Sequence, residues 1–213
     1  MSDIFREIDE ELRRENYLKL WQRYGKHLIA AAILIVIATA LLVAWREYQS
    51  RERQAEGVRY AAALDLERQG KDKDALDAFT AMAASATDGR GVLARFEEAA
   101  LRAKTGDRDG ALALYDEIAK TGSLEQTYRD LANLLAARLL VDKDPKEATQ
   151  RLLPLTDANN PWHATALELT AIADLKEGNK TEARATYQRI SDDLAAPQGV
   201  RARAAEMVAA LSQ

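Results

Sequence analysis

The residues best suited to chemistry are the two histidines and the carboxylates near one of them. His163 follows Trp162 near the expected start of a helix, and Asp157 and Glu168 lie close to it in the sequence. A histidine with two carboxylates can bind a divalent metal or move a proton, but a metal site needs more ligands at a fixed spacing. We favour the alternative, a surface histidine in the first turn of a helix. His27 stands alone beside a long apolar run.

Two short motifs could also suggest a functional site, but each has a better explanation as a structural element. Asn179-Lys180-Thr181 matches an N-glycosylation acceptor, but with Glu182 it also forms a capping box that would begin a helix, which we prefer. The second motif, Asp88-Gly89-Arg90-Gly91, is interpreted as a loop between helices. The sequence has no phosphate-binding loop, dinucleotide-binding glycine motif, serine-nucleophile elbow or zinc-protease motif, and no cysteine. We therefore predict a protein that is not an enzyme and uses no cofactor or metal.

The longest apolar run extends from Leu28 to Trp45, eighteen residues without a charge. As a helix it would be about 27 Å long, close to the roughly 30 Å hydrocarbon core of a bilayer. A buried core helix would keep a polar face, and a signal peptide would carry a cleavage site, so we predict an uncleaved membrane anchor. The residues expected to contact membrane lipid are Leu28, Ile33, Leu34, Ile35, Val36, Ile37, Leu41, Leu42, Val43 and Trp45.

The flanks of this run suggest an orientation. Five Lys and Arg lie in the twenty residues before it and four in the twenty after it, which weakly favours a cytoplasmic N-terminus. We predict a cytoplasmic helical segment over 1–27, an anchor over 28–45, a helical stalk over 46–55 with a Glu47–Arg51 pair, and a folded domain over 56–213. Ile4, Ile8 and Leu12 make a stripe that fits either a membrane-surface or partner-binding helix, or a soluble tail.

The composition of the rest of the chain is typical of an ordinary helical domain. The whole chain has 30 Lys and Arg against 34 Asp and Glu, a net charge of −4, which argues against a nucleic-acid surface. Alanine is abundant after Trp45, while glycine and proline are sparse. This composition predicts an all-α domain.

The domain contains an internal repeat. A glycine is followed by an alanine five residues later and by an aromatic or large aliphatic residue four residues after that, with a second alanine twelve residues before the first. The central alanines are 36, 37 and 35 residues apart. Each unit reads as a helix hairpin in which two small residues let the backbones approach, and the glycine ends the first helix. The repeat residues are Ala63, Gly70, Ala75, Phe79, Ala99, Gly106, Ala111, Tyr115, Ala136, Ala148, Leu152, Ala171, Gly178, Ala183 and Tyr187.

Local signals predict where several helices begin and end. Ser123, Asp144-Pro145 and Asn160-Pro161 each suggest an N-cap, and Pro154 should end a helix early. After the fourth unit, residues 197–211 predict a short helix that covers the exposed end of the stack.

This pattern resembles the tetratricopeptide repeat over about residues 56–192, in four units. Alanine replaces the usual glycine of the first helix, and no unit carries the usual tryptophan, so the repeat is divergent. The predicted fold is therefore all-α, with one N-terminal transmembrane helix followed by a tetratricopeptide-like solenoid of helical hairpins and a C-terminal capping helix. Such solenoids bind other proteins on a concave surface.

The whole architecture also resembles the bacterial YfgM family, ancillary subunits of the Sec translocon, through Gly25-Lys26 before the apolar run and Trp45-Arg46-x-Tyr48 after it. This resemblance implies a single-pass inner-membrane protein with a periplasmic domain. It implies association with the Sec channel and a membrane-anchored periplasmic isomerase chaperone, and contact with unfolded secreted proteins. The alternatives are an adaptor in envelope assembly or cell division that binds one folded partner, and a scaffold that faces the cytoplasm.

Overall fold

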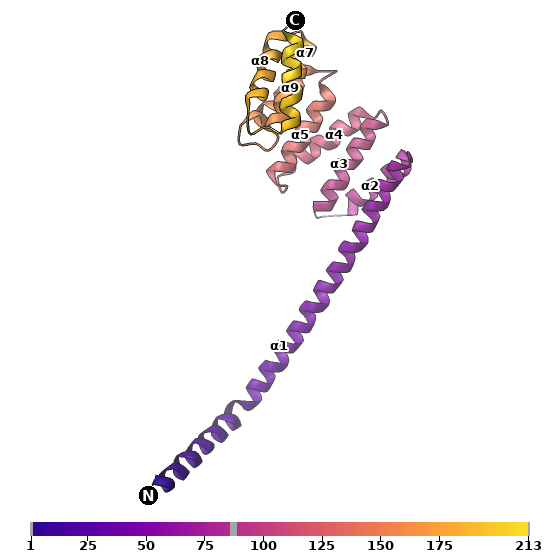
Figure 1. The fold of residues 1–213 in the computed structure, drawn as a ribbon. Helices are drawn as coiled ribbons and strands as arrows, with labels where there is room; N and C mark the ends of the chain where they lie inside the picture. The colour runs from indigo at the N-terminus through magenta and orange to yellow at the C-terminus, as the bar shows by residue number, and fades with distance from the viewer. Residues whose placement is uncertain (1, 86–88, 213) are drawn as a thin grey trace. The chain divides into compact units, whose positions relative to one another are not determined.

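The computed structural model describes the backbone of residues 2–85 and 89–212, and these two ranges contain no strand. The elements are α1 (Ser2–Arg68), α2 (Asp72–Ser85), α3 (Gly89–Lys104), α4 (Arg108–Lys120), α5 (Gln126–Leu140), α6 (Pro145–Leu152), the 3₁₀ turn η1 (Leu153–Thr156), α7 (His163–Glu177), α8 (Lys180–Asp192) and α9 (Gln198–Leu211). The predicted all-α class is confirmed (Figure 1).

The chain forms two compact units, Met1–Val58 and Arg59–Gln213, and α1 belongs to both. Because α1 passes residues 27, 45 and 55 without a break, the boundaries that we expect there stay predictions. Each unit is described by itself below.

The first unit consists of the N-terminal part of α1. It contains a stretch long and apolar enough to cross a membrane, and none of the most apolar window is buried. Leu34 is 68% exposed and Leu41 is 66% exposed, whereas the core helix of a soluble protein would bury such side chains. The other predicted anchor residues are exposed too, namely Ile33, Ile35, Val36, Ile37, Leu42, Val43 and Trp45. The side chains of Leu28 and of residues 2–20, which include the Ile4 stripe, lie outside the described ones.

Hydrogen bonds within the helix satisfy the polar side chain inside the apolar run and join two charged side chains just after it. The Thr39 hydroxyl donates to the carbonyl of Ile35 at 2.7 Å, as expected of a threonine in an apolar helix. Past the apolar run, the Arg51 Nε donates to Glu47 at 2.8 Å, which confirms the predicted i, i+4 pair. The rings of Trp45 and Tyr48 lie 6.4 Å apart at this end of the run.

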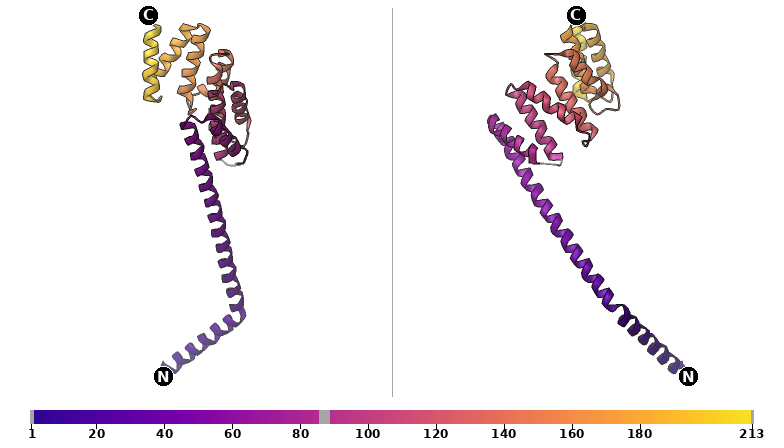
Figure 2. Two further views of the ribbon diagram at one scale, coloured as in Figure 1. Left: turned by 90° about the vertical axis from the view of Figure 1, so that its right-hand side faces the viewer. Right: turned by 180° about the vertical axis from the view of Figure 1, so that it is seen from behind.

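The second unit is a stack of helix hairpins. The end of α1 pairs with α2, α3 with α4, α5 with α6, and α7 with α8, and each helix from α2 to α7 also packs against the next one along the chain (Figure 1). Helix α9 packs against α8 and α7, and Val200, Met207 and Leu211 cover the cluster around Ala171 and Tyr187 (Figure 2). This last helix covers the end of the stack as predicted.

The repeat alanines lie at the contacts between these helices. None is more than 1% exposed, so each lies where two helices approach closely. The large residues of the repeat fill the space beside them, since Phe79, Tyr115, Leu152 and Tyr187 are all buried. The three repeat glycines have φ of +73° (Gly70), +99° (Gly106) and +86° (Gly178), the left-handed conformation predicted for the residue that ends a helix. The eight alanines are Ala63, Ala75, Ala99, Ala111, Ala136, Ala148, Ala171 and Ala183.

Two helix-end predictions are confirmed. Asp144 is the N-cap of α6, where its Oδ1 accepts from the Glu147 amide at 3.0 Å and Pro145 occupies the first helical position. Pro154 lies in η1, so α6 ends at Leu152.

Two N-cap predictions are wrong, because in both places loop residues make tertiary contacts before the next helix begins. Helix α5 begins at Gln126 rather than near Ser123, since Leu124 packs against the cluster around Ile118 before the helix starts. Helix α7 begins at His163, because Asn160 accepts from the amide of Trp162 and donates to Asp130 and so forms a turn instead.

Two further expectations are corrected at helix starts. Asn179 is the N-cap of α8, but its side chain makes no capping bond and donates to Glu177 at 3.2 Å instead, so the capping box is not formed. Gly89, Arg90 and Gly91 belong to α3 rather than to a loop, because the helix-forming residues after them extend the helix toward the N-terminus. Asp88 lies outside the described residues.

We expect Ala111→Leu to destabilise the repeat domain by about 1–3 kcal/mol, because a larger side chain would overpack the close contact of α4 with its neighbours. Ala111 is completely buried. The matched control is Lys120→Leu on the same helix, where an exposed side chain should tolerate the change within about 0.5 kcal/mol. Urea denaturation of the two variants measures both values. Equal loss of stability in the two variants would contradict the assignment of Ala111 to a helix contact.

Candidate protein-binding groove

The residues singled out for chemistry do not come together. The His163 Nδ1 donates to the carbonyl of Thr156 at 2.8 Å and holds η1 to the start of α7. Asp157 accepts from the amide of Asn159, and Glu168 is paired with Arg203 on α9 at 2.8 Å. Across the described ranges, no group of three or more His, Cys, Asp and Glu side chains is arranged to hold a metal ion. His163 therefore has a structural contact rather than a place in a site.

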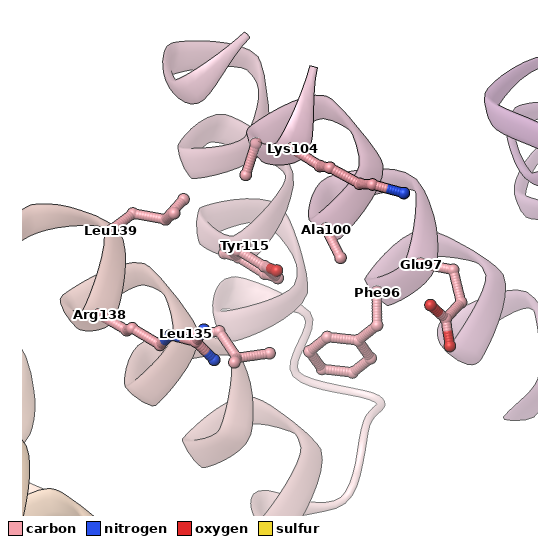
Figure 3. A pocket seen from close by; sticks show the side chains of 9 residues that line it. Phe96, Glu97, Ala100, Lys104, Tyr115, Leu135, Arg138 and Leu139 are labelled. Carbon is pink, nitrogen blue, oxygen red and sulfur yellow. The ribbon is translucent and has the colours of Figure 1, made fainter. Parts of the chain in front are cut away.

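One hollow of the second unit lies between α3 and α5, with α4 beneath it (Figure 3). It has a volume of about 470 Å³ and opens to solvent. Phe96 and Ala100 of α3, Tyr115 of α4, and Leu135 and Leu139 of α5 make its apolar surface. We call this hollow the α3–α5 groove. Its shape and lining suit the side chains of a peptide segment rather than a small polar metabolite.

One wall of the groove carries a carboxylate held by a tyrosine. Glu97 of α3 accepts a hydrogen bond from the Tyr60 hydroxyl at 2.9 Å. Burial, together with this hydrogen bond to a carboxylate, raises the pKa of Tyr60 to about 12. Tyr60 also packs edge-on against Phe79, with ring centroids 5.5 Å apart. The end of α1 is thereby fixed to α3 by a polar contact and to α2 by an apolar one.

Lys104 lies at the rim of the same wall, and its charge is balanced. Its Nζ lies 2.8 Å from Asp72 and 3.6 Å from Glu67. The hydrogen bond to Asp72 is the main cause of a raised pKa for Lys104. Because two carboxylates neutralise it, Lys104 offers little net attraction to an anion in the groove.

Tyr115 forms the floor of the groove, and Arg138 belongs to the opposite wall, on α5. Tyr115 is only 4% exposed, and its ring lies 6.2 Å from the ring of Phe96. Burial raises the pKa of Tyr115, while the Arg138 guanidinium lowers it and Glu97 raises it. Arg138 extends from α5 beside Leu135 (Figure 3). A neutral phenol and a guanidinium therefore share this part of the groove.

A second hollow of about 320 Å³ lies beside the groove, between α4, α5 and the start of α6, and Leu139 contributes to both. Its charged rim contains Arg108, Asp109 and Lys143, with Lys143 lying 3.6 Å from Asp109. Ion pairs of this exposed kind contribute little to stability and leave the side chains free to rearrange around a partner.

Most repeat residues build the walls of the groove rather than line it. Of the repeat residues, Tyr115 alone lines the groove. Glu97, Leu135, Arg138 and Leu139 were not singled out from the sequence. The last three are spaced i, i+3, i+4 on α5, a single helix face, and this spacing was the available signal. Nothing in the sequence indicated which face of α5 would stay open.

A tetratricopeptide repeat-like domain matches residues 19–208 of the chain, which is most of its length. The chain belongs to this tetratricopeptide repeat-like family. No curated protein and no solved structure is similar enough to add to this assignment. The match extends over the apolar stretch of α1 as well as the hairpin stack. Tetratricopeptide repeat-like domains are typically non-catalytic modules for protein–protein interaction, and the α3–α5 groove suits that role.

Proposed function

We propose that this protein is a single-pass inner-membrane protein whose repeat domain binds other proteins beside the Sec translocon. It would receive secreted proteins as they leave the channel and pass them to periplasmic chaperones. The observation that carries the proposal is the continuity of α1, in which an exposed apolar stretch leads directly into the first helix of a tetratricopeptide repeat-like domain.

The membrane part of the proposal is supported by physical features of α1. Its apolar side chains face outward, where lipid would take the place of water, and aromatic residues lie at both ends of the run. Trp21 and Tyr24 are exposed before it, and Trp45 and Tyr48 are exposed after it. The excess of Lys and Arg before the run supports a cytoplasmic N-terminus, which would leave the repeat domain in the periplasm.

The partner part of the proposal is supported by the groove and by the resemblance to the YfgM family. An open, largely apolar groove with charged rims fits segments of unfolded or partly folded proteins. The family resemblance supports the Sec channel and the membrane-anchored isomerase chaperone as partners. An adaptor for one folded protein would use the same surface. The experiment must therefore distinguish binding of many secreted proteins from binding of one folded partner.

We expect a periplasmic C-terminus. A phosphatase that is active only in the periplasm should be active when fused after Gln213, and a reporter that works only in the cytoplasm should be inactive there. The measurement is reporter activity per unit of membrane-bound fusion protein. An inactive phosphatase on a stably produced fusion would reverse the orientation, and the translocon proposal would fail with it.

Crosslinking in cells then tests the partners. A photoreactive residue at Ala100, in the groove, should capture the chaperone and several secreted proteins, whereas one at Ala113 should not. Both alanines are exposed in the structure, but Ala113 lies outside the groove. Crosslinks from Ala100 to one folded protein in constant proportion would favour the adaptor. Equal crosslinking from both positions would rule out the groove as the binding surface.

A further inference from the structure

The apolar residues that follow the membrane-anchor stretch of α1 lie on one stripe of the helix. Between residues 46 and 58 these are Tyr48, Ala55 and Val58, and the remaining residues apart from Gly57 are polar or charged. Their spacings of seven and three residues match positions a, a and d of the heptad repeat, written abcdefg, of a coiled coil. Tyr48 is 58% exposed, Val58 is 70% exposed, and Ala55 is exposed too. The stripe therefore faces outward.

The same register extends in both directions along α1. Toward the N-terminus, steps of four and three residues from Tyr48 reach exposed apolar side chains at Ala44, Leu41, Ile37 and Leu34. Toward the C-terminus, the sequence continues the spacing at Ala62. Because nearly every residue of the anchor is apolar, the three residues of the segment 46–58 are the ones that fix the register. An apolar period of 3.5 residues from residue 34 to residue 62 is typical of a helix that winds around another helix.

The segment 46–58 also lacks the packing that usually stabilises a helix in water. None of the side chains described between residues 34 and 58 is buried. The exposed Glu47–Arg51 pair contributes only about 0.3–0.5 kcal/mol, while Gly57 in the helix interior costs about 1 kcal/mol relative to alanine. Helices in proteins gain most of their stability from packing an apolar face. A partner helix along the stripe would supply that packing.

The partner that matches this stripe best is a second copy of the chain. The partner must cross the membrane and continue beyond it as one helix with the same 3.5-residue period, and a parallel second copy does so in the same register. Arg51 is the charged residue at a d position, and its Nε lies 2.8 Å from Glu47, at the g position beside the stripe. In a parallel pair the two arginines would share one layer, and each would bring its own counter-charge. A single polar layer of this kind fixes the register and the number of chains.

We propose that the protein forms a parallel homodimer through α1. The contact would run from the anchor into the segment beyond it, and we call it the α1 seam. Each dimer would carry two repeat domains, so that a partner with two binding segments could engage both and be held more tightly than by one. The seam residues are Leu34, Ile37, Leu41, Ala44, Tyr48, Arg51, Ala55 and Val58.

The first test uses single cysteines, since the chain has none of its own. Ala55→Cys and Val58→Cys place a thiol on the α1 seam, whereas the control Gly57→Cys places it at a c position outside the seam. A Cβ atom at Gly57 meets no atom within 4 Å, so this substitution fits the helix. Under mild oxidation of native membranes, the two seam variants should form disulfide-linked dimers, because the two Cβ atoms must approach within about 4.5 Å. Gly57→Cys should form several-fold less of this product.

Two differently tagged copies, produced together in one cell, identify the partner. A disulfide-linked product that carries both tags supports the homodimer. A product of one tagged chain with another membrane protein would assign the stripe to that protein and overturn the inference. Equal crosslinking at residues 55, 57 and 58 would indicate random collision and would overturn it as well, as would the lack of any linked product.

The second test measures association of the full-length chain in detergent micelles by analytical ultracentrifugation. Val58→Asp should weaken dimerisation by about tenfold or more, because it sets two like charges against each other in the seam. The matched control is Gly57→Asp, which adds the same charge at the next residue and should leave the dimer intact. Equal weakening in the two variants, or a wild-type chain that is monomeric at every concentration, would overturn the inference. The proposed function would then still stand, because neither the reporter fusion nor the crosslinks from Ala100 depend on the number of chains.

Discussion

Replacing Ile35 and Ile37 together with aspartate is expected to release the protein from the membrane or prevent its insertion. Both side chains are exposed on α1 near the middle of the apolar run. Each aspartate at the centre of a spanning helix costs about 2.5–3.5 kcal/mol, so the pair should cost roughly 5–7 kcal/mol. Aspartate is too short to reach the membrane surface, which leaves this cost in place. The measurement is the share of the chain that stays with the membranes after a carbonate wash.

The control places the same two charges outside the apolar run. Gln54→Asp with Ala55→Asp lies on an exposed part of α1, and it should leave the wash-resistant share unchanged. If the unsubstituted chain is itself recovered in the soluble fraction, α1 is not a membrane anchor. If Ile35→Asp with Ile37→Asp behaves like the control, the spanning segment has been placed wrongly.

The second large effect is expected in the core of the repeat domain. Leu152→Ala should reduce the free energy of unfolding by about 2–5 kcal/mol, because it leaves a cavity in a fully enclosed cluster. Leu152 is completely buried, where α6 packs with Leu134, Leu140 and Ala166 from the flanking helices. Urea denaturation of the full-length chain in detergent, followed by circular dichroism, measures the difference.

The neighbouring leucine gives a matched control for this substitution. Leu153 is 69% exposed, so Leu153→Ala removes the same atoms from the next position of the chain without opening a cavity. It should change stability by no more than about 0.5 kcal/mol. Similar losses in the two variants would mean that α6 is not packed as described.

Much of the fold could be predicted because its signals are local. The spacing of alanines, the turn glycines and the Asp144-Pro145 cap all act within one or two helix turns, and the structure has helices where they indicate them. The failures occurred where a distant contact decided the outcome. Asn160, which precedes Pro161, has the residue type expected of an N-cap. Its hydrogen bond to Asp130, thirty residues earlier, holds it in a turn instead.

The groove could not be predicted for the same reason. Tyr115 fits the repeat pattern and was expected to fill space between helices, which its ring does against Phe96. That Tyr115 and Arg138 line the same groove depends on how α4 and α5 pack, and no short-range pattern in the sequence encodes this. Arg138 looks like any other charge on an exposed helix face until its neighbours are known.

The order of packing in the second unit has a consequence for how it is made. From α2 onward, each helix packs against the next one along the chain, and the tertiary contacts of α9 are with α7 and α8. The contact order is therefore low, and chains of this kind fold quickly because no early segment waits for a late one. If the chain emerges N-terminus first, each hairpin can pack against the next one as soon as that next hairpin has emerged. The domain is thus suited to vectorial folding, unit by unit, from the end that is joined to α1.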